Sequence, residues 1–323
     1  MRPRRRFRSR LAKVMASYLT VKRALGYKLV TDEKALRYLD SFLSSRFPKA
    51  TDLSVPILQA WMTGLAPLTR LTRLGMVRQV CLFRRRTAPS AFVPDRMRHP
   101  CLWPTRAPRH VPFIFTKEQL RRLLEAALTP SDARGARERS NALFMTLLLA
   151  YAAGLRLAEV SRLTVGDIDL DQATLLIRDT KFFKSRVVPV APEVLQRIRG
   201  HIAERFGTAS PAPEQRLFQH GGRPYSSHTL GILGSQLMRE CGFKPVQGRG
   251  GARVHDLRHT FAVHRICQWY EQGEDVQSRL PLLATYMGHK DIVSTQRYMT
   301  VTAEILGHAG RRFEQACAPT EGR

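Results

Sequence analysis

Six prolines spaced along residues 87–112 constrain the fold of this chain more than any other feature of its sequence. Proline lacks a backbone N–H and fixes its own φ angle, so a segment this rich in proline breaks regular elements. The six are Pro89, Pro94, Pro100, Pro104, Pro108 and Pro112. We therefore predict a linker over residues 89–112, between an N-terminal domain at 11–88 and a larger domain at 113–323.

The N-terminal domain is predicted to be entirely helical. Its first apolar residues recur at steps of three and four, as one face of a helix requires: Leu11, Val14, Met15, Tyr18 and Leu19. Similar patterns begin near residues 31 and 55 and run over residues 69–86. Residues 1–10 carry six arginines, and we expect this arm to be disordered until it meets phosphate; a solvated tail is the alternative.

The larger domain is predicted to combine helices with one small antiparallel sheet. Thr116, with Gln119 three residues later, forms a capping box at the start of a helix. Two β-rich runs, 173–177 and 186–190, predict a hairpin. Further helices are expected at 142–153, 192–205, 229–241, 255–270, 280–287, 294–298 and 303–317. The predicted fold class is mainly α with a small antiparallel β-sheet: a helical N-terminal domain followed by an α+β domain.

The chain carries a large excess of positive charge. Lys and Arg number 53 against 26 Asp and Glu, which gives a net charge of +27. This excess is far beyond what solubility needs and indicates a polyanionic partner, most simply nucleic acid. A solvated basic surface, a membrane-surface role and a ribosomal role are alternatives. We disfavour these alternatives because the charge is spread along the chain and because the chain also contains a set of candidate catalytic residues.

That set fits phosphoryl transfer on a nucleic acid backbone. His255 and Arg258 lie three positions apart, so they share one face of the predicted helix. A guanidinium beside an imidazole can hold a phosphate through a bidentate charge and a titratable hydrogen bond. Tyr298, nine residues after His289, is a candidate nucleophile. Alone, His255 would be interpreted as a core or capping histidine, and Arg156 as an ion-pair partner.

Taken together, these motifs resemble the tyrosine recombinase (phage integrase) family, of the mobile-element type. The central match is His255-x-Leu257-Arg258-His259-Thr260-Phe261-Ala262, followed by Met287-Gly288-His289 and then Tyr298. Gly154-Leu155-Arg156-x-x-Glu159 resembles the upstream arginine box of the family. Residues 180–189 resemble its β-hairpin lysine motif. The resemblance covers about residues 110–310, and the N-terminal domain fits the family in being helical and basic.

The resemblance implies six catalytic residues: Arg156, Lys181, His255, Arg258, His289 and Tyr298. The two arginines and His289 would hold the non-bridging phosphate oxygens. Tyr298 would attack phosphorus to form a 3′-phosphotyrosyl bond. Lys181 would protonate the leaving 5′-hydroxyl, and His255 would take the proton of Tyr298. His259 is interpreted as a supporting or packing residue.

The hairpin departs from the pattern of the family. Glycine usually stands on both sides of the first lysine, whereas Thr180 and Phe182 stand there in this chain. Lys184 is therefore an alternative to Lys181. We choose Lys181 because its distance from residues 186–189 fits the family motif.

The implied partner is double-stranded DNA with specific recombination sites. Four copies of the chain would exchange strands on two such sites, alone or with sister recombinases, and the arginines of the linker would follow the DNA. Because the phosphotyrosyl bond conserves energy and two arginines supply positive charge, we expect no cofactor, metal or ATP. Two alternatives remain: a type IB-like topoisomerase acting as a monomer, and a DNA-binding accessory protein that has lost catalysis.

The predicted location is the cytoplasm, in association with the bacterial nucleoid. The five cysteines are scattered and form no Cys-x-x-Cys pair, which indicates neither a disulfide framework nor a zinc site. Residues 1–10 are not followed by the apolar core of a signal peptide. The longest apolar run, residues 142–155, is too short for a membrane span, which needs about 20 residues.

Overall fold

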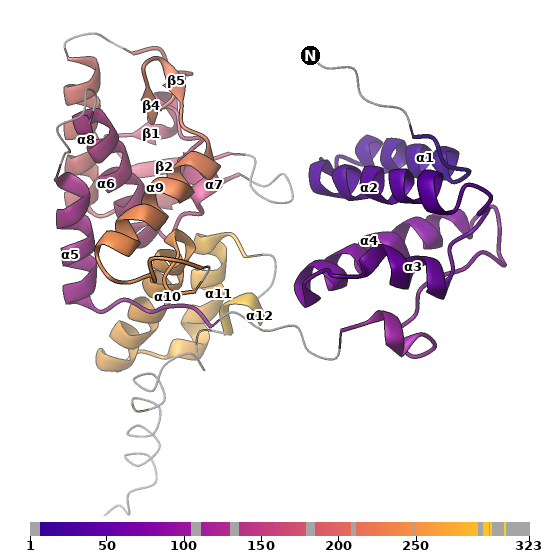
Figure 1. The fold of residues 1–323 in the computed structure, drawn as a ribbon. Helices are drawn as coiled ribbons and strands as arrows, with labels where there is room; N and C mark the ends of the chain where they lie inside the picture. The colour runs from indigo at the N-terminus through magenta and orange to yellow at the C-terminus, as the bar shows by residue number, and fades with distance from the viewer. Residues whose placement is uncertain are drawn as a thin grey trace, which may run out of the picture. The chain divides into compact units, whose positions relative to one another are not determined.

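The structure is a computed structural model that describes residues 7–104, 111–129, 136–178, 185–207, 211–248, 250–289, 293–296, 298 and 307. The chain divides into two compact units, Met1–His110 and Val111–Arg323 (Figure 1). This division falls inside the proline-rich segment. Three predictions concern residues outside those described: the arginine arm over residues 1–6, the hairpin tip with Lys181 and Lys184, and the C-terminal helix at 303–317, apart from Gly307.

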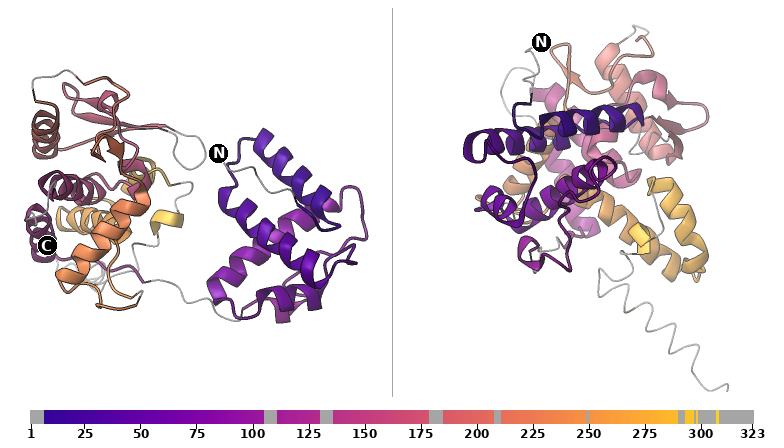
Figure 2. Two further views of the ribbon diagram at one scale, coloured as in Figure 1. Left: turned by 45° about the horizontal axis from the view of Figure 1, so that its top comes forward. Right: turned by 90° about the vertical axis from the view of Figure 1, so that its right-hand side faces the viewer.

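The first unit contains four α-helices: α1 (Ala12–Ala24), α2 (Val30–Arg46), α3 (Val55–Met62) and α4 (Pro67–Arg84) (Figure 2). Pro56 and Pro67 stand in the first turns of α3 and α4, where a missing N–H leaves no intrahelical bond unmade. Leu36, Leu58 and Leu74 are fully buried between the helices. The predicted all-helical N-terminal part is therefore confirmed.

Part of the segment predicted as a linker packs against this first unit. A short 3₁₀ helix, η1 (Pro100–Leu102), contacts α3 and buries Leu102 completely. Arg70 on α4 donates hydrogen bonds to the carbonyls of Cys101 and Leu102, each 2.8 Å long. The prolines prevent regular structure here, but they leave Leu102 and Val93 free to join the hydrophobic core.

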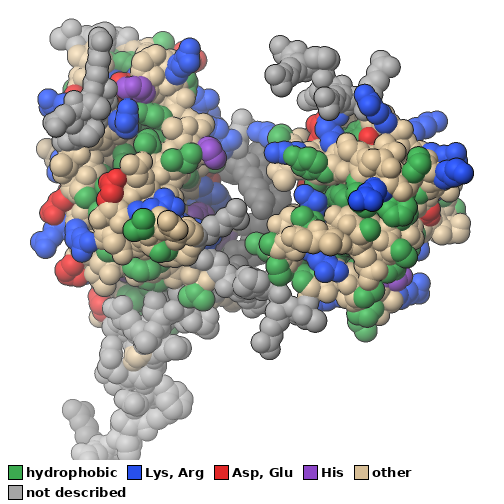
Figure 3. Space-filling view, viewed as in Figure 1, with side chains coloured by type: hydrophobic (Ala, Val, Ile, Leu, Met, Phe, Trp, Pro, Cys, Tyr) green, Lys and Arg blue, Asp and Glu red, His purple; other side chains and the backbone are tan. Residues whose placement is uncertain are grey.

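The positive charge is concentrated in the first unit, contrary to the even spread expected from the sequence. Residues 1–110 hold 24 Lys and Arg against five Asp and Glu, a net charge of +19, whereas the remaining chain holds 29 against 21. Figure 3 shows several lysine and arginine side chains scattered over the visible face of this unit and few acidic ones.

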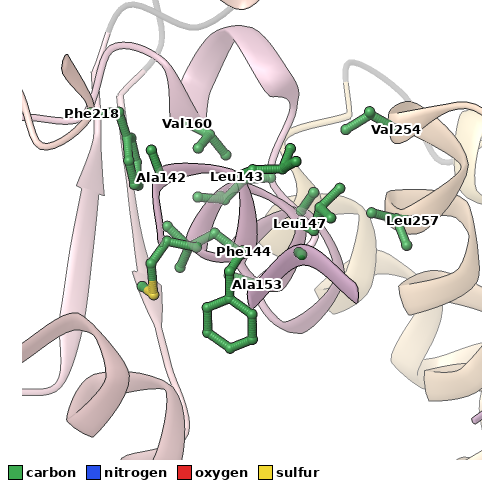
Figure 4. Close-up of a cluster of buried hydrophobic side chains, with 14 of the residues drawn as sticks. Ala142, Leu143, Phe144, Leu147, Ala153, Val160, Phe218, Val254 and Leu257 are labelled. Carbon is green, nitrogen blue, oxygen red and sulfur yellow. The ribbon is translucent and has the colours of Figure 1, made fainter. Parts of the chain in front are cut away.

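The second unit is built around the buried helix α6 (Ala136–Ala152). It contacts α5 (Lys117–Leu128), α8 (Pro192–Phe206), α9 (Ser227–Glu240) and α10 (Val254–Glu271). Figure 4 shows Leu143 and Leu147 of α6 in the cluster that also holds Val160, Phe218 and Leu257. Thr116 and Gln119 form the predicted capping box at the start of α5.

Helix α6 begins at Ala136, six residues before the start predicted at residue 142. The extra turn is stabilised by ion pairs with α8. Arg137 pairs with Glu204 at 3.1 Å, and Glu138 pairs with Arg205 at 3.0 Å. These tertiary contacts cannot be inferred from local periodicity, so the apolar pattern alone placed the start too late.

A three-stranded antiparallel sheet follows α6 and the short helices α7 (Leu157–Val160) and η2 (Val165–Asp167). Its strands pair in the order β1 (Ile168–Asp169), β2 (Thr174–Ile177) and β3 (Arg186–Pro189). Leu175 lies opposite Val188, and both are fully buried. The predicted fold class, mainly α with a small antiparallel sheet, is confirmed.

A second hairpin, β4 (Gln219–His220) and β5 (Arg223–Pro224), lies between the predicted helices 192–205 and 229–241, where no strand was predicted. Its turn is Gly221-Gly222, and both glycines have positive φ angles, which glycine adopts without a steric penalty. Two-residue strands are too short to leave an alternating pattern in the sequence.

The C-terminal part of the second unit forms a smaller core between α10 and α11 (Val276–Met287), which Tyr298 joins. Helix α11 begins at Val276, four residues before the predicted start, because Asp275 caps it by accepting the N–H of Gln277 at 3.0 Å. Pro281 therefore lies inside this helix rather than in its first turn. None of the helices in the described part of the chain is long and apolar enough to cross a membrane.

Candidate active site

Arg258 is the most deeply buried residue of the predicted set. It lies on α10 and is 1% exposed. Its guanidinium donates hydrogen bonds to the carbonyls of Gly154, after α6, and of Met287, at the end of α11. The side chain of Arg258 thus connects α10 with the turn after α6 and with the end of α11. The planar guanidinium of arginine suits this role because it presents several N–H donors in a fixed geometry.

The close approach of α10 to the turn at Gly154 explains why glycine stands there. Gly154 has a φ angle of +59°, which favours glycine, and a Cβ atom at this position would lie 2.6 Å from the ring of Phe261. This turn places the carbonyl of Gly154 within hydrogen-bond reach of Arg258. Arg156 follows two residues later, beside the same junction.

Arg156 lies beside the same junction. It donates a hydrogen bond of 2.9 Å to the carbonyl of Gly288, and it forms an ion pair of 2.7 Å with Glu159. From the sequence alone, Arg156 would be interpreted as an ion-pair partner, and the ion pair with Glu159 does form. The same pair also holds Arg156 next to the segment that carries Met287 and His289.

Glu159 is shared between two arginines. Its carboxylate is 2% exposed and accepts hydrogen bonds from Arg156 and from Arg186 at the start of β3. Burial raises the pKa of Glu159, but hydrogen bonds and charge from Arg186, together with the bonds from Arg156, outweigh it and lower the pKa to about 2. Arg186 also donates to the carbonyl of Tyr286 at 2.8 Å. It thus ties β3 to α7 and α11.

Glu159→Gln is expected to destabilise the protein at neutral pH, and the difference should shrink as pH falls. The pKa of Glu159 is about 2 in the folded chain and 4.5 ordinarily. The carboxylate therefore stabilises the fold above about pH 4.5, and this contribution is lost as pH falls towards 2. The shift corresponds to at most about 3 kcal/mol. Urea unfolding of both proteins from about pH 7 down to about pH 3, which covers the plateau and the upper part of this titration, measures the difference.

A suitable control for this prediction is Glu138→Gln. Glu138 also pairs with an arginine, Arg205, but its side chain is 40% exposed, so its replacement should cost under about 1 kcal/mol. A difference for Glu159→Gln that is independent of pH contradicts the assigned role of its charge.

His255 lies one turn before Arg258, at the surface of the site. Desolvation by the surrounding protein and then the positive charge of Arg258 lower its pKa. Its ring packs edge-on against that of His259, with centroids 4.8 Å apart. The lowered pKa favours the neutral imidazole, and His255 lies next to Arg258, as the spacing of the motif predicts.

Tyr298 is 4% exposed, and its hydroxyl lies 2.9 Å from Nδ1 of His259. The ring of His289 stacks on that of Tyr298, with centroids 6.1 Å apart, and Nδ1 of His289 lies 2.7 Å from the hydroxyl of Thr295. Thr295 belongs to α12 (Val293–Gln296), which ends two residues before the tyrosine. The structure thus brings His255, His289, Arg156, Arg258 and Tyr298 to one site, while Lys181 lies outside the described residues.

Two residues of this site, His259 and Arg186, were not among the six predicted catalytic residues. His259 was interpreted as a supporting residue because it follows Arg258 directly. It stands four positions after His255, however, and that spacing places the two histidines on one helix face. Arg186 served only to align the hairpin motif, and its contact with Glu159 depends on the fold of the sheet.

Comparisons with known proteins agree with this geometry. The model of the phage integrase family matches residues 114–304. A protein of Sinorhizobium fredii named as an integrase/recombinase, y4rB, is 32% identical over 95% of this chain and 98% of its own. Tyrosine recombinase XerD of Caulobacter vibrioides is 26% identical over 90% of this chain and 91% of its own.

Solved structures share the fold. The Tn1549 transposon integrase in complex with circular intermediate DNA superposes with a TM-score of 0.65 at 18% identity, over 94% of this chain and 99% of that chain. XerH recombinase bound to its difH substrate gives 0.62 at 17% identity, over 87% and 78%. With the family model matching more than half of the chain, these findings confirm the resemblance noted in the sequence. The chain belongs to the phage integrase family of tyrosine recombinases.

Proposed function

We propose that this chain is a site-specific DNA recombinase of a mobile element, which cuts and rejoins DNA through a 3′-phosphotyrosyl bond to Tyr298. Integrases and Xer recombinases are its relatives, and the family cuts and rejoins DNA.

The observation that carries the proposal is the uncompensated positive charge around Arg258. Burial and then the charge of Arg156 lower the pKa of Arg258 to about 9, and Glu159 only partly opposes them. Arg258 remains charged at neutral pH, so it repels Arg156, whose side chain is 26% exposed at the same junction. A phosphodiester relieves this repulsion, and the transition state, which carries more negative charge on the same oxygens, relieves it further.

The remaining groups of the site complete the chemistry. His289 donates a hydrogen bond to phosphate oxygens, and Lys181 protonates the leaving 5′-oxygen. His255, next to Arg258, is the acceptor for the proton of Tyr298 that the family resemblance implies. The phosphotyrosyl bond conserves the energy of the broken phosphodiester, so the reaction needs no ATP. Because the arginines carry the charge stabilisation, it needs no metal.

Double-stranded DNA with specific sites is the proposed substrate, and four copies of the chain, alone or with sister recombinases, act on two sites. The Tn1549 integrase and XerH are DNA-bound in their solved structures. The net charge of +19 on residues 1–110 makes the first unit suitable for contacting the phosphate backbone. The cytoplasm, at the nucleoid, is where such a substrate lies.

Affinity for DNA is expected to fall steeply as salt increases, because each phosphate contact releases condensed counterions. An interface of about eight contacts loses on the order of a thousandfold or more in affinity between roughly 50 and 200 mM salt. Fluorescence anisotropy with a labelled duplex measures the slope. A nearly flat dependence contradicts a broad phosphate interface.

The experiment that tests the proposed function begins with a library of nicked duplexes of randomised sequence. Denaturing gels isolate covalent protein–DNA adducts, and sequencing of the trapped DNA gives the preferred site. Two labelled duplexes carrying that site are then incubated with the protein. Exchange of label supports a recombinase. Relaxation of a supercoiled plasmid that carries the site, without exchange of label between duplexes, indicates a topoisomerase. The absence of any adduct indicates a DNA-binding accessory protein.

A further inference from the structure

We propose that His259 is a catalytic residue that accepts the proton of Tyr298 during DNA cleavage, an inference that rests on the proposed function. The hydroxyl of Tyr298 and Nδ1 of His259 are 2.9 Å apart, which is hydrogen-bond distance. Because Tyr298 is 4% exposed, bulk water has little access to the hydroxyl. A nearby side chain must therefore take the proton when the oxygen attacks.

The geometry favours His259 over the other two histidines of the site. His289 stacks on the tyrosine with the ring planes 28° apart, and its Nδ1 contacts Thr295 instead. His255 contacts the ring of His259 at its edge. Burial and then the charges of Arg258, Arg156 and Arg253 lower the pKa of His255, and the charge of Asp256 opposes them. A positive charge from the transferred proton is therefore disfavoured on His255, and that residue is better suited to donate to phosphate.

The proton moves from Tyr298 to His259 as the phosphotyrosyl bond forms. A phenol keeps its proton at neutral pH, so the O–H of Tyr298 donates to Nδ1, and His259 carries its own hydrogen on Nε2. On cleavage the O–H bond breaks, Nδ1 gains the proton, and the oxygen forms a bond to phosphorus. The bond from phosphorus to the 5′-oxygen breaks, and that oxygen takes a proton from Lys181. Religation reverses each step, and His259 returns its proton to Tyr298.

Two substitutions and one altered nucleophile test the role of His259. His259→Gln retains a hydrogen-bonding side chain but cannot accept a proton. Its single-turnover cleavage rate should fall on the order of a hundredfold, the scale for one general base. The substrate is the nicked duplex selected above, with sulfur in place of the leaving 5′-oxygen, so that departure needs no protonation.

Rescue distinguishes proton acceptance from a structural role. A fluorinated tyrosine at position 298, with a phenol that ionises near neutral pH, needs no base. It should restore most of the cleavage rate lost in His259→Gln. It should not restore the cleavage rate of His255→Gln. His264→Gln is the matched control, because His264 lies on the same helix and contacts a different tyrosine hydroxyl, that of Tyr151, at 3.1 Å. Its cleavage rate should stay within about threefold of that of the wild type, as expected for a residue outside the reaction.

Each outcome of this experiment has a distinct meaning. An unchanged rate in His259→Gln overturns the inference, and so does a loss that the fluorinated tyrosine fails to restore. Rescue of His255→Gln alone assigns the role to His255 instead. If the wild-type protein forms no adduct with any duplex of the library, the proposed function fails, and the inference fails with it.

Discussion

Tyr298→Phe is expected to bind the selected DNA site as tightly as the wild-type protein and to form no covalent adduct with it. The substitution removes one oxygen and leaves the ring packed in the core between α10 and α11. Loss of the hydrogen bond to His259 should cost about 1 kcal/mol of stability. DNA binding depends on many basic residues that this change does not touch.

Denaturing electrophoresis with the nicked duplex measures the adduct, and anisotropy measures binding. The matched control is Tyr286→Phe. Tyr286 contributes to the same core, and its hydroxyl donates to the carbonyl of Pro189 at 3.0 Å. Adduct formation should persist in that control. An adduct that survives in Tyr298→Phe would remove Tyr298 from the role of nucleophile.

Arg258→Lys is expected to lower the rate of cleavage on the order of a hundredfold or more, the scale for removal of one preorganised donor. Lysine retains the charge but presents its donors from a single nitrogen. It cannot reach the carbonyls of Gly154 and Met287 together and still offer the same geometry to phosphate. DNA binding should change little.

Single-turnover cleavage measures this loss, and thermal unfolding at the same pH reveals any change in stability. Arg265→Lys is the control, since Arg265 lies on the same helix but its hydrogen bond goes to Gln268 at an exposed position. That variant should cleave at the rate of the wild type. Full activity in Arg258→Lys would show that the buried arginine is structural.

The sequence predicts the architecture well where local signals are strong. The capping box at Thr116 and the proline-rich segment are read directly from residue type. The sequence fails where tertiary contacts decide the outcome. Helix α6 gains a first turn from its ion pairs with α8, and the prolines before residue 104 do not prevent Leu102 from entering the core.

The candidate site divides in the same way. The order and spacing of Arg156, His255, Arg258, His289 and Tyr298 identify them as a set, and the structure places all five at one junction. The contact of Tyr298 with His259 was not predicted, because it depends on where α12 leaves the tyrosine relative to α10. The contact of Arg186 with Glu159 likewise depends on how β3 packs beside α7.

The central claim is that Tyr298 attacks a phosphate of the DNA backbone and that arginines stabilise the negative charge of the transition state. The most direct measurement is mass spectrometry of the trapped adduct, formed in excess chelator and digested with nuclease and protease. We predict a nucleotide joined through its 3′-phosphate to the tyrosine of the peptide that contains Tyr298, in the same yield with and without chelator. A nucleotide on any other residue, or an adduct that forms only when metal is added, would contradict the account.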